Sequence, residues 1–298
     1  MEHEADIQKI GYRGFLDIFK KECSMNNDYT PPPIKKTTYI LVHGAWHGSW
    51  CYDEVASLLK ETGQKVIIPD LPGRNSTSPD AFKNINLNTY VDFITDIVKK
   101  QKNPVTLVGH SLAGVIISQV AENIPDKIEH LIYITAFIPD SGESLFDETK
   151  NFKEPGLSTE MIVDLATNRI TLNKSEKAME HLFGDCEPEA AKKAMKRLQD
   201  SDAYQPFVAP ITTTANRFGR IKKTYVLGRK DSSIIMEDQL KIAIRNKCRM
   251  IILEAGHSPF LSAKEYLADA LLNNYGQPTQ FSDRVKEPEV ENWRKFYF

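Results

Sequence analysis

The chain contains few cysteines, and their spacing forms no pattern that would join them into a site. Its 298 residues include four cysteines. None belongs to a C-x-x-C pair, so the spacing excludes a zinc ribbon or a disulfide framework. Scattered thiols are typical of a reducing compartment, and we therefore expect a cytoplasmic protein. The cysteines are Cys23, Cys51, Cys186 and Cys248.

An excess of charge of one sign and long apolar runs are also missing. The 38 Lys and Arg residues and the 40 Asp and Glu residues leave a net charge of -2. Nucleic-acid-binding proteins usually show a basic excess or stripe, so we expect no nucleic-acid partner. No polybasic patch or apolar run long enough to span a bilayer is present, so we expect no membrane partner. The acidic start MEHEADIQKI lacks the apolar region of a signal peptide.

The two ends of the chain differ from its middle. Residues 7–21 predict a short amphipathic helix, and three consecutive prolines, 31–33, favour extended backbone after it. We interpret residues 1–36 as an N-terminal extension with a Pro-rich linker, which could pack on the body, pair with a second subunit in a homodimer, or be partly disordered. The polar C-terminal tail, residues 276–298, has no assigned role.

A regular alternation begins at residue 37. Short, nearly continuous apolar runs rich in β-branched residues are typical of strands covered on both faces. Helical stretches separate them, and this alternation predicts an α/β fold with a mostly parallel sheet. The expected strands are 38–42, 65–68, 105–108, 130–134, 224–227 and 250–253, and the expected helices are 50–62, 88–102, 112–124, 233–246 and 262–274.

Residues 141–220 interrupt the alternation. They contain no convincing strand, whereas 157–167, 174–183 and 187–200 have helical patterns. We expect a helical cap, inserted before the penultimate strand, over the carboxyl ends of the strands, where ligands bind in open α/β sheets. Residues 37–140 and 221–275 would then form the core.

One motif combines a strand, a tight turn and a helix around a serine. The apolar run from Val105 leads into Gly109-His-Ser-Leu-Ala-Gly114, and an apolar helical stretch follows. This context is typical of a nucleophile elbow with Ser111 at its apex. Ala113 stands where the G-x-S-x-G pattern has its second glycine, and alanine is still small enough for a close helix–strand approach. The alternative is an ordinary serine N-cap.

A second motif follows the first strand. His43-Gly-Ala-Trp46 begins the loop that supplies one oxyanion-hole N–H in such enzymes, and the residue after the nucleophile supplies the other. This predicts an oxyanion hole formed by the backbone amides of Ala45 and Leu112. His43 and His47 lack the helical H-E-x-x-H context, so we expect no metal there. We expect His43 to brace the loop, and His47 to do the same or to face the pocket.

A histidine and a carboxylate complete the constellation. His257 follows the last strand, where the base belongs in the order Ser…Asp/Glu…His. Asp231, in the loop after the penultimate strand, is the favoured acid that would orient the imidazole. Asp140 is the rival, since it follows the strand 130–134, and Glu254 lies at the end of the last strand.

These motifs resemble a known branch of the α/β-hydrolases. The segments His43–Trp50, Pro69–Gly73, Gly109–Gly114 and Glu254–Phe260 look like those of plant methylesterases, hydroxynitrile lyases and their bacterial esterase relatives. The resemblance covers about residues 38–275. It implies an α/β-hydrolase fold with a helical cap, no cofactor, and small carboxylic esters as substrates.

The same resemblance separates two activities. Hydroxynitrile lyases of this branch place a threonine after the His-Gly pair and a lysine after the triad histidine. This chain has Ala45 and Ser258 there. A serine cannot supply the positive charge that stabilises departing cyanide, so the resemblance favours ester hydrolysis.

The resulting hypothesis is a serine-dependent carboxylesterase that acts on small, largely apolar esters through an acyl-enzyme. The alternatives are a non-hydrolytic lyase or cyclase with the same triad, and a small-molecule receptor of this fold. Aromatic residues next to the catalytic segments either line an apolar pocket or pack in the core. They are Trp46, His47, Phe137 and Phe260.

Overall fold

The computed structural model describes residues 36–74, 76, 78 and 80–272. The predicted N-terminal extension, apart from Lys36, and the predicted tail lie outside the described residues. Within the described part, no helix combines the length and apolar character needed to cross a bilayer.

A central sheet organises the described residues into an α/β architecture. Six strands, all parallel, run in the order β2-β1-β3-β4-β8-β9. Each predicted strand is confirmed within one or two residues, because nearly continuous apolar runs fit strands that are covered on both faces. The strands are β1 (Thr38–Val42), β2 (Lys65–Ile67), β3 (Val105–His110), β4 (Ile128–Ile134), β8 (Lys222–Gly228) and β9 (Arg249–Leu253).

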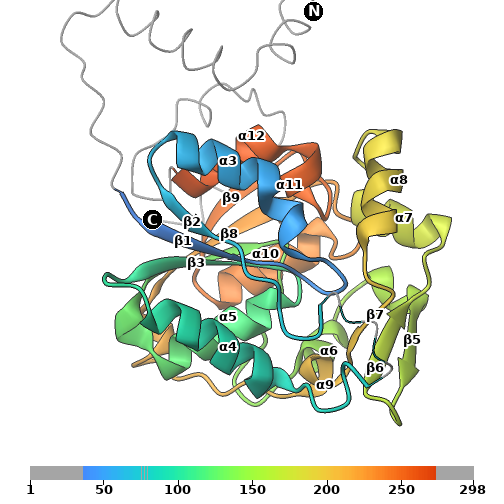
Figure 1. Cartoon of the computed structure of the whole chain (residues 1–298), viewed down its shortest axis with the longest axis horizontal. Helices are drawn as coiled ribbons and strands as arrows, with labels where there is room; N and C mark the ends of the chain where they lie inside the picture. The colour runs from blue at the N-terminus through green and yellow to red at the C-terminus, as the bar shows by residue number, and fades with distance from the viewer. Residues whose placement is uncertain (1–35, 75, 77, 79, 273–298) are drawn as a thin grey trace, which may run out of the picture.

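Helices cover both faces of this sheet (Figure 1). Alternate residues of β1 show the division. Tyr39 and Leu41 pack in the cluster that holds α3 and α12, while Ile40 and Val42 pack in the cluster that holds α4, α5 and α10. The elements of these layers are η1 (Ser49–Tyr52), α3 (Asp53–Glu61), α4 (Leu87–Lys99), α5 (Ala113–Asn123), η2 (Pro125–Lys127), α10 (Met236–Arg245), α11 (Pro259–Ser262) and α12 (Lys264–Leu272).

The strand order reverses beside β1. The chain passes from β1 to the edge strand β2 and then returns to β3 on the other side of β1. The loops after β1 and β3 therefore diverge, and such a switch point is where ligands bind in open parallel sheets. Both motifs predicted for catalysis, at His43–Trp46 and at Ser111, follow these two strands.

The cap differs from the sequence prediction. Residues 141–220 were expected to lack strands, but β5, β6 and β7 form an antiparallel sheet there (Figure 1). The expected helix 157–167 is wrong. The Asp164 carboxylate accepts the Ala166 and Thr167 amides, which favours a tight turn after β5 rather than continued helix. The cap elements are α6 (Leu145–Thr149), η3 (Gly156–Glu160), β5 (Met161–Asp164), β6 (Arg169–Leu172), α7 (Glu176–Phe183), α8 (Pro188–Arg197), β7 (Ser201–Ala203), α9 (Gln205–Val208) and η4 (Phe218–Arg220).

The other two helices expected in the cap are present. The stretch 174–183 contains α7, and the stretch 187–200 contains α8. The Ser175 hydroxyl accepts the Ala178 amide at 3.0 Å and so caps α7, and a proline occupies the first position of α8. The cap is therefore mixed, with helices and a small sheet, rather than helical throughout.

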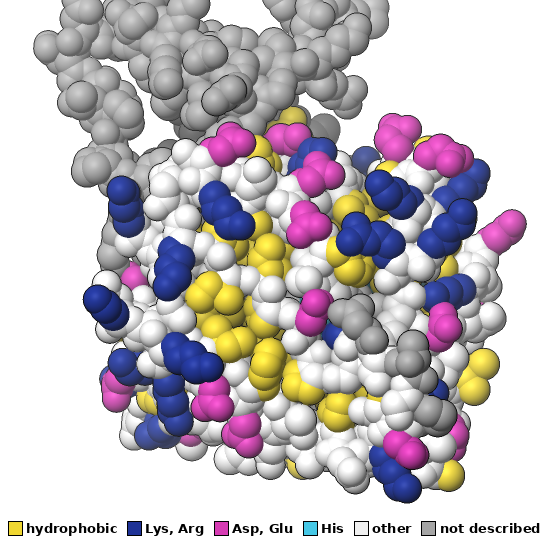
Figure 2. All heavy atoms as spheres, viewed as in Figure 1, with side chains coloured by type: hydrophobic (Ala, Val, Ile, Leu, Met, Phe, Trp, Pro, Cys, Tyr) yellow, Lys and Arg dark blue, Asp and Glu magenta, His cyan; other side chains and the backbone are white. Residues whose placement is uncertain are grey.

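The surface seen from the same direction carries charges of both signs. Figure 2 shows acidic and basic side chains distributed over this face and apolar side chains gathered near its middle. This pattern agrees with a chain whose formal net charge is only -2.

Candidate active site

Ser111 occupies a strained turn between β3 and α5. Its φ of 52° lies in the left-handed region, which is unfavourable for a residue other than glycine. Its amide donates to the Ile134 carbonyl at 3.2 Å, and its carbonyl accepts the Phe137 amide at 3.3 Å. The end of β4 and the following segment thus hold the turn in its strained conformation, as a nucleophile elbow requires.

Gly114 explains why alanine is tolerated at position 113. A Cβ added to Gly114 would lie 2.2 Å from the Phe137 carbonyl oxygen, so the close approach of α5 to the segment after β4 requires this glycine. Ala113 is buried without such a conflict. The departure from the G-x-S-x-G pattern therefore leaves the elbow intact.

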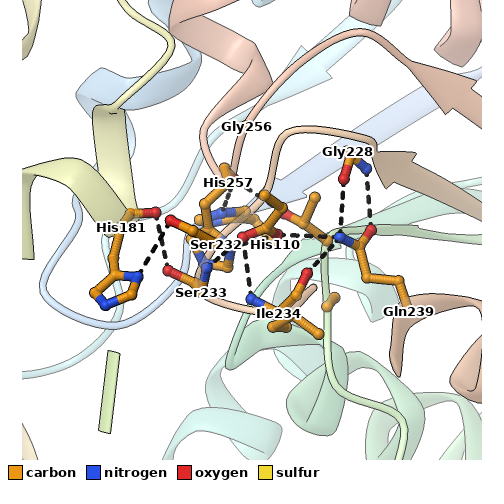
Figure 3. A network of polar contacts seen from close by, with 12 residues as sticks. His110, His181, Gly228, Ser232, Ser233, Ile234, Gln239, Gly256 and His257 are labelled. Atoms are coloured by element: carbon orange, nitrogen blue, oxygen red, sulfur yellow. Dashed lines mark hydrogen bonds and ion pairs between the residues drawn. The ribbon is translucent and has the colours of Figure 1, made fainter. Parts of the chain in front are cut away.

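His257 and Asp231 form a buried pair. The Nδ1 of His257 lies 2.9 Å from the Oδ2 of Asp231, and the two side chains are 3% and 0% exposed. The His257 carbonyl accepts the Thr135 hydroxyl at 3.0 Å and the Nε2–H of His110 at 2.9 Å. The rings of His110 and His257 have centroids 4.8 Å apart. Figure 3 shows His257 next to His110, and because His110 directly precedes Ser111, the imidazole of His257 lies beside the elbow.

The Asp231 carboxylate is fixed by its own loop and by α10. Its Oδ1 accepts the amides of Ser233 at 2.7 Å and Ile234 at 3.0 Å. The Nε2 of the fully buried Gln239 lies 3.3 Å from Oδ2 and donates to the Ile234 carbonyl at 2.6 Å (Figure 3). These donors orient the carboxylate so that Oδ2 faces His257.

The two rival acids lie in other ion pairs. Asp140 is exposed, and its Oδ1 lies 3.1 Å from the Nε of Arg245. Glu254 is exposed and pairs with Arg229 at 2.5 Å. Of the three carboxylates weighed from the sequence, the structure brings Asp231 to the imidazole.

The loop after β1 is braced by His43, as predicted. The Nδ1–H of His43 donates to the Gly44 carbonyl at 2.9 Å, and its Nε2 accepts the Leu71 amide at 3.1 Å. Burial, followed by the nearby Arg74 cation, lowers the His43 pKa to about 3. The imidazole is therefore neutral near pH 7, which the accepting role of Nε2 requires.

His47 is a second brace of the same loop. Its Nδ1–H donates to the Ala45 carbonyl at 2.8 Å, and burial lowers its pKa to about 3. A Cβ on Gly44 would lie 2.7 Å from the His110 Nδ1 and 3.0 Å from the Ser111 Cβ. The braced loop therefore lies directly against the elbow.

Two backbone amides near Ser111 have no partner. Among the described residues, neither the Ala45 amide nor the Leu112 amide donates a hydrogen bond. Buried N–H groups are nearly always paired, so an unpaired N–H beside a strained serine is available to a bound group. These are the two amides that the sequence predicted for an oxyanion hole.

The four predicted pocket residues differ in their surroundings. Trp46, His47 and Phe260 are buried, and the Phe260 ring packs against Tyr52 and His110 at centroid distances of 5.3 and 4.9 Å. Phe137 is only half-buried. Contact with a substrate stays a prediction for all four.

No metal site is evident in the part of the chain that the structure describes. Its histidines, cysteines and carboxylates form no group of three or more that could hold an ion. Cys51, Cys186 and Cys248 are free thiols.

Sequence reasoning missed the residues that support the site from a distance. Gln239 holds the Asp231 loop, and Asp202 of the cap accepts the Trp46 amide at 3.0 Å. Arg74, next to Pro72-Gly73, pairs with Asp202. None of these residues belongs to a motif, and only the fold brings them to the catalytic segments.

Comparison with known proteins identifies the family. The model of the α/β hydrolase family matches residues 39–270. The chain belongs to this family. The match covers the sheet, its helices and the cap, and it confirms the fold expected from the sequence.

Several relatives of this hydrolase are named as esterases or hydrolases. It is 28% identical over 255 residues to the pyrethroid hydrolase of Sphingobium wenxiniae, covering 82% of this chain and 90% of that protein. It is 28% identical over 240 residues to methyl jasmonate esterase 1 of Vitis vinifera, with 75% and 91% covered. It is 37% identical over 125 residues to a carbendazim-hydrolysing esterase of Nocardioides, but that match spans only 42% of this chain and 52% of the relative.

Solved structures agree with this placement. A pyrethroid hydrolase from Sphingobium faniae superposes with a TM-score of 0.72 at 26% identity, covering 84% of this chain and 99% of that one. Polyneuridine aldehyde esterase, at 20% identity and a TM-score of 0.70, shares the fold. The predicted branch, with plant methylesterases and bacterial relatives, is confirmed. The names of these relatives are consistent with a carboxylesterase-type hydrolase.

Proposed function

We propose that this hydrolase is a serine carboxylesterase that uses Ser111, His257 and Asp231. The observation that carries the proposal is the buried His257–Asp231 pair, with Nδ1 and Oδ2 2.9 Å apart, beside a serine whose φ is 52°. A nucleophile needs a base within reach and a third group that orients the base. These three residues supply those roles in the chain order of this family.

Acylation begins with attack of the Ser111 Oγ on the ester carbonyl carbon. The His257 Nε2 accepts the serine proton, and Asp231 stabilises the imidazolium through Nδ1–H. The carbonyl oxygen becomes an oxyanion, which the amides of Ala45 and Leu112 bind. These donors are already in place and have no other partner among the described residues, so they require little rearrangement.

Acylation ends when the tetrahedral intermediate collapses. The C–O bond to the alcohol breaks, and His257 returns its proton to the leaving alkoxide. Deacylation then repeats the same steps with water. Water then attacks the acyl carbon while His257 takes its proton, and Ser111 leaves with that proton. The products are a carboxylic acid and an alcohol, and the enzyme is regenerated without a cofactor.

The surroundings favour a small, largely apolar ester. The Phe260 ring packs against His47 and His110 beside the Ser111 turn, at centroid distances of 5.6 and 4.9 Å, and the cap contacts the loop after β1 through Trp46. The names of the relatives, which include pyrethroid hydrolase and methyl jasmonate esterase, support an ester with an apolar part. A small-molecule ester is therefore the proposed partner, and a cytoplasmic location and a homodimer stay predictions.

A series of p-nitrophenyl esters of increasing acyl length tests this function. Wild type should turn over the short esters, and Ser111→Ala should lose about 10³-fold or more in kcat. Ser118→Ala is the matched control, because Ser118 lies on α5 and its hydroxyl donates to the Gly114 carbonyl at 2.7 Å. Its kcat per folded molecule should stay within about 2-fold of wild type.

The same experiment distinguishes the alternatives. A mass increase equal to the acyl group on the peptide that contains Ser111 would support the acyl-enzyme. Folded wild type with no ester turnover and no acylation would contradict the proposal, and would favour a lyase, a cyclase or a receptor that keeps the triad.

A further inference from the structure

Trp46, the residue after the proposed oxyanion donor Ala45, is held by the cap. Its φ of 58° lies in the left-handed region. Its carbonyl accepts the Gln199 amide at 2.8 Å, and its indole Nε1–H donates to the Ile170 carbonyl at 3.0 Å. Its own amide donates to the Asp202 Oδ2 at 3.0 Å. All three partners belong to the cap, so the cap fixes a strained residue of the core.

Asp202 is the central acceptor of this contact. Its carboxylate is fully buried and forms an ion pair with Arg74, whose side chain is also buried. The Oδ1 accepts the Tyr90 hydroxyl at 2.9 Å and the Ala203 amide at 2.8 Å. A buried carboxylate with this many donors keeps one orientation, and that orientation presents Oδ2 to the Trp46 amide.

The loop after β2, which contains Gly73 and Arg74, is tied to the same cap segment. The Nη1 of Arg74 donates to the Gln199 Oε1 at 3.3 Å, and the Gln199 Nε2 donates to the Gly73 carbonyl at 3.1 Å. The segment around β7 therefore joins two core loops at one place.

The contact fixes the peptide plane next to the proposed oxyanion donor. In the Ala45–Trp46 peptide, the N–H is held by Asp202 and the C=O by His47. In the preceding Gly44–Ala45 peptide, the C=O is held by His43. A trans peptide directs its N–H opposite to its C=O, so the Ala45 N–H points away from His43. Without Asp202, the Ala45–Trp46 peptide plane would be free to rotate, and this rotation would displace Ala45 and its N–H.

We propose that Asp202 is a positioning residue for the oxyanion hole, so that ester hydrolysis requires the cap strand β7 to be seated on the core. The inference rests on the proposed function, since it assigns the Ala45 amide to the oxyanion. Asp202 touches no reacting atom and acts through Trp46. Its loss should therefore reduce transition-state stabilisation more than substrate binding.

Steady-state kinetics of Asp202→Ala on a p-nitrophenyl ester test the proposal. We expect kcat per active site to fall about 100-fold with KM changed less than about 3-fold, because a displacement of about 1 Å at a catalytic group has effects of this size. Titration with p-nitrophenyl diethyl phosphate counts the active sites, so misfolded protein does not contribute. Binding of a trifluoromethyl ketone, which forms a tetrahedral oxyanion adduct, should weaken by the same factor as kcat.

Three further variants separate positioning from stability. Tyr90→Phe removes a hydrogen bond to the same carboxylate but leaves Oδ2 and the Trp46 amide in place, so its kcat should stay within about 2-fold of wild type. Asp202→Asn keeps one side-chain oxygen, and the Arg74 cation favours placing it where Oδ2 now accepts the Trp46 amide. Its kcat should therefore be higher than that of Asp202→Ala. Arg74→Met/Asp202→Ala removes both buried charges together and should fold even if the single variant does not, yet keep the low kcat.

The proposal is overturned if Asp202→Ala, or the double variant, has kcat per active site and ketone affinity within about 2-fold of wild type. Indole ¹⁵N–¹H spectra give a readout that does not depend on activity, because the chain has three tryptophans. The Trp46 indole proton should exchange with solvent faster in Asp202→Ala than in wild type. If wild type hydrolysed no ester, the proposed function would fail. If, in addition, the Trp46 indole proton exchanged at the same rate in Asp202→Ala as in wild type, Asp202 would not be the residue that restrains the loop after β1.

Discussion

His257 and Asp231 lie 26 residues apart in the chain, and their Nδ1 and Oδ2 atoms are 2.9 Å apart, with both side chains buried. The carboxylate fixes the imidazole with its proton on Nδ1 and leaves Nε2 free to act as a base. The neighbouring Ser111 turn supplies the group from which a base would take a proton. In the proposed mechanism, the pair thus sets both the imidazole tautomer and the direction of proton transfer.

Replacing the acid tests this relationship. Asp231→Asn should lower kcat by about 10⁴-fold, because an amide in place of the carboxylate favours the wrong imidazole tautomer. KM should change little. Asp140→Asn is the matched control, since the Asp140 carboxylate pairs with Arg245, and its kcat should stay within about 2-fold. A large loss of kcat in Asp140→Asn with little loss in Asp231→Asn would assign the acid to the earlier strand.

The central sheet could be predicted from the sequence because its signal is local. A strand such as Thr38–Val42 is buried on both faces, so four of its five residues are apolar and the run is visible without knowledge of its neighbours. The cap hairpin is different. Ile162 and Val163 in β5 are exposed, and a short half-exposed strand has the same composition as a turn of helix. The prediction of a helix there failed for this reason.

The residues of the candidate site could also be located from the sequence, because each follows a recognisable strand. Ser111, His257 and Asp231 lie at strand ends, where small residues and family order mark them. Asp202 could not be found in this way. Its contact with Trp46 spans 156 residues, and an isolated aspartate in a cap segment carries no sign of the donors that surround it. Residues that act through packing become visible only when the fold is known.

Gly114→Ala should destabilise the protein. The added Cβ would meet the Phe137 carbonyl oxygen at 2.2 Å, and a backbone atom cannot move aside without displacing the segment that holds the Ser111 carbonyl. We expect a loss of about 1–3 kcal/mol in the free energy of unfolding, measured by urea denaturation. Ala113→Gly, which restores the G-x-S-x-G pattern, is the control and should cost less than about 1 kcal/mol. Equal stability of Gly114→Ala and wild type would disprove the close approach.

Gln239→Met should lower both stability and kcat. Gln239 is fully buried, and its amide bonds both the Gly228 amide and carbonyl and the Ile234 carbonyl, so methionine leaves these groups unpaired. We expect a loss of about 1–3 kcal/mol in the free energy of unfolding. The Asp231 loop would loosen, and kcat should fall about 10-fold, less than for Asp231→Asn. A stable variant with unchanged kcat would show that the backbone amides alone orient Asp231.

Acid should destabilise the fold through the histidines that brace the loop after β1. Burial lowers the pKa of His43 and His47 to about 3, compared with about 6.5 in an unfolded chain. Between these values the unfolded chain binds protons that the folded protein does not, so stability is complete above about pH 6.5 and falls as the pH decreases. From pH 7 to pH 5 the free energy of unfolding should decrease by about 2–4 kcal/mol, as measured by urea denaturation at each pH.

His47→Asn tests whether the acid sensitivity arises in this loop. The Asn Nδ2 can occupy the position of the imidazole Nδ1 and donate to the Ala45 carbonyl, which His47 bonds at 2.8 Å, but asparagine does not titrate. The loss of stability between pH 7 and pH 5 should therefore shrink by about 1–2 kcal/mol relative to wild type, whatever the variant costs at pH 7. The comparison between two pH values removes that constant cost. An unchanged loss would mean that His47 takes up its proton in the folded state, so that burial does not keep its imidazole neutral.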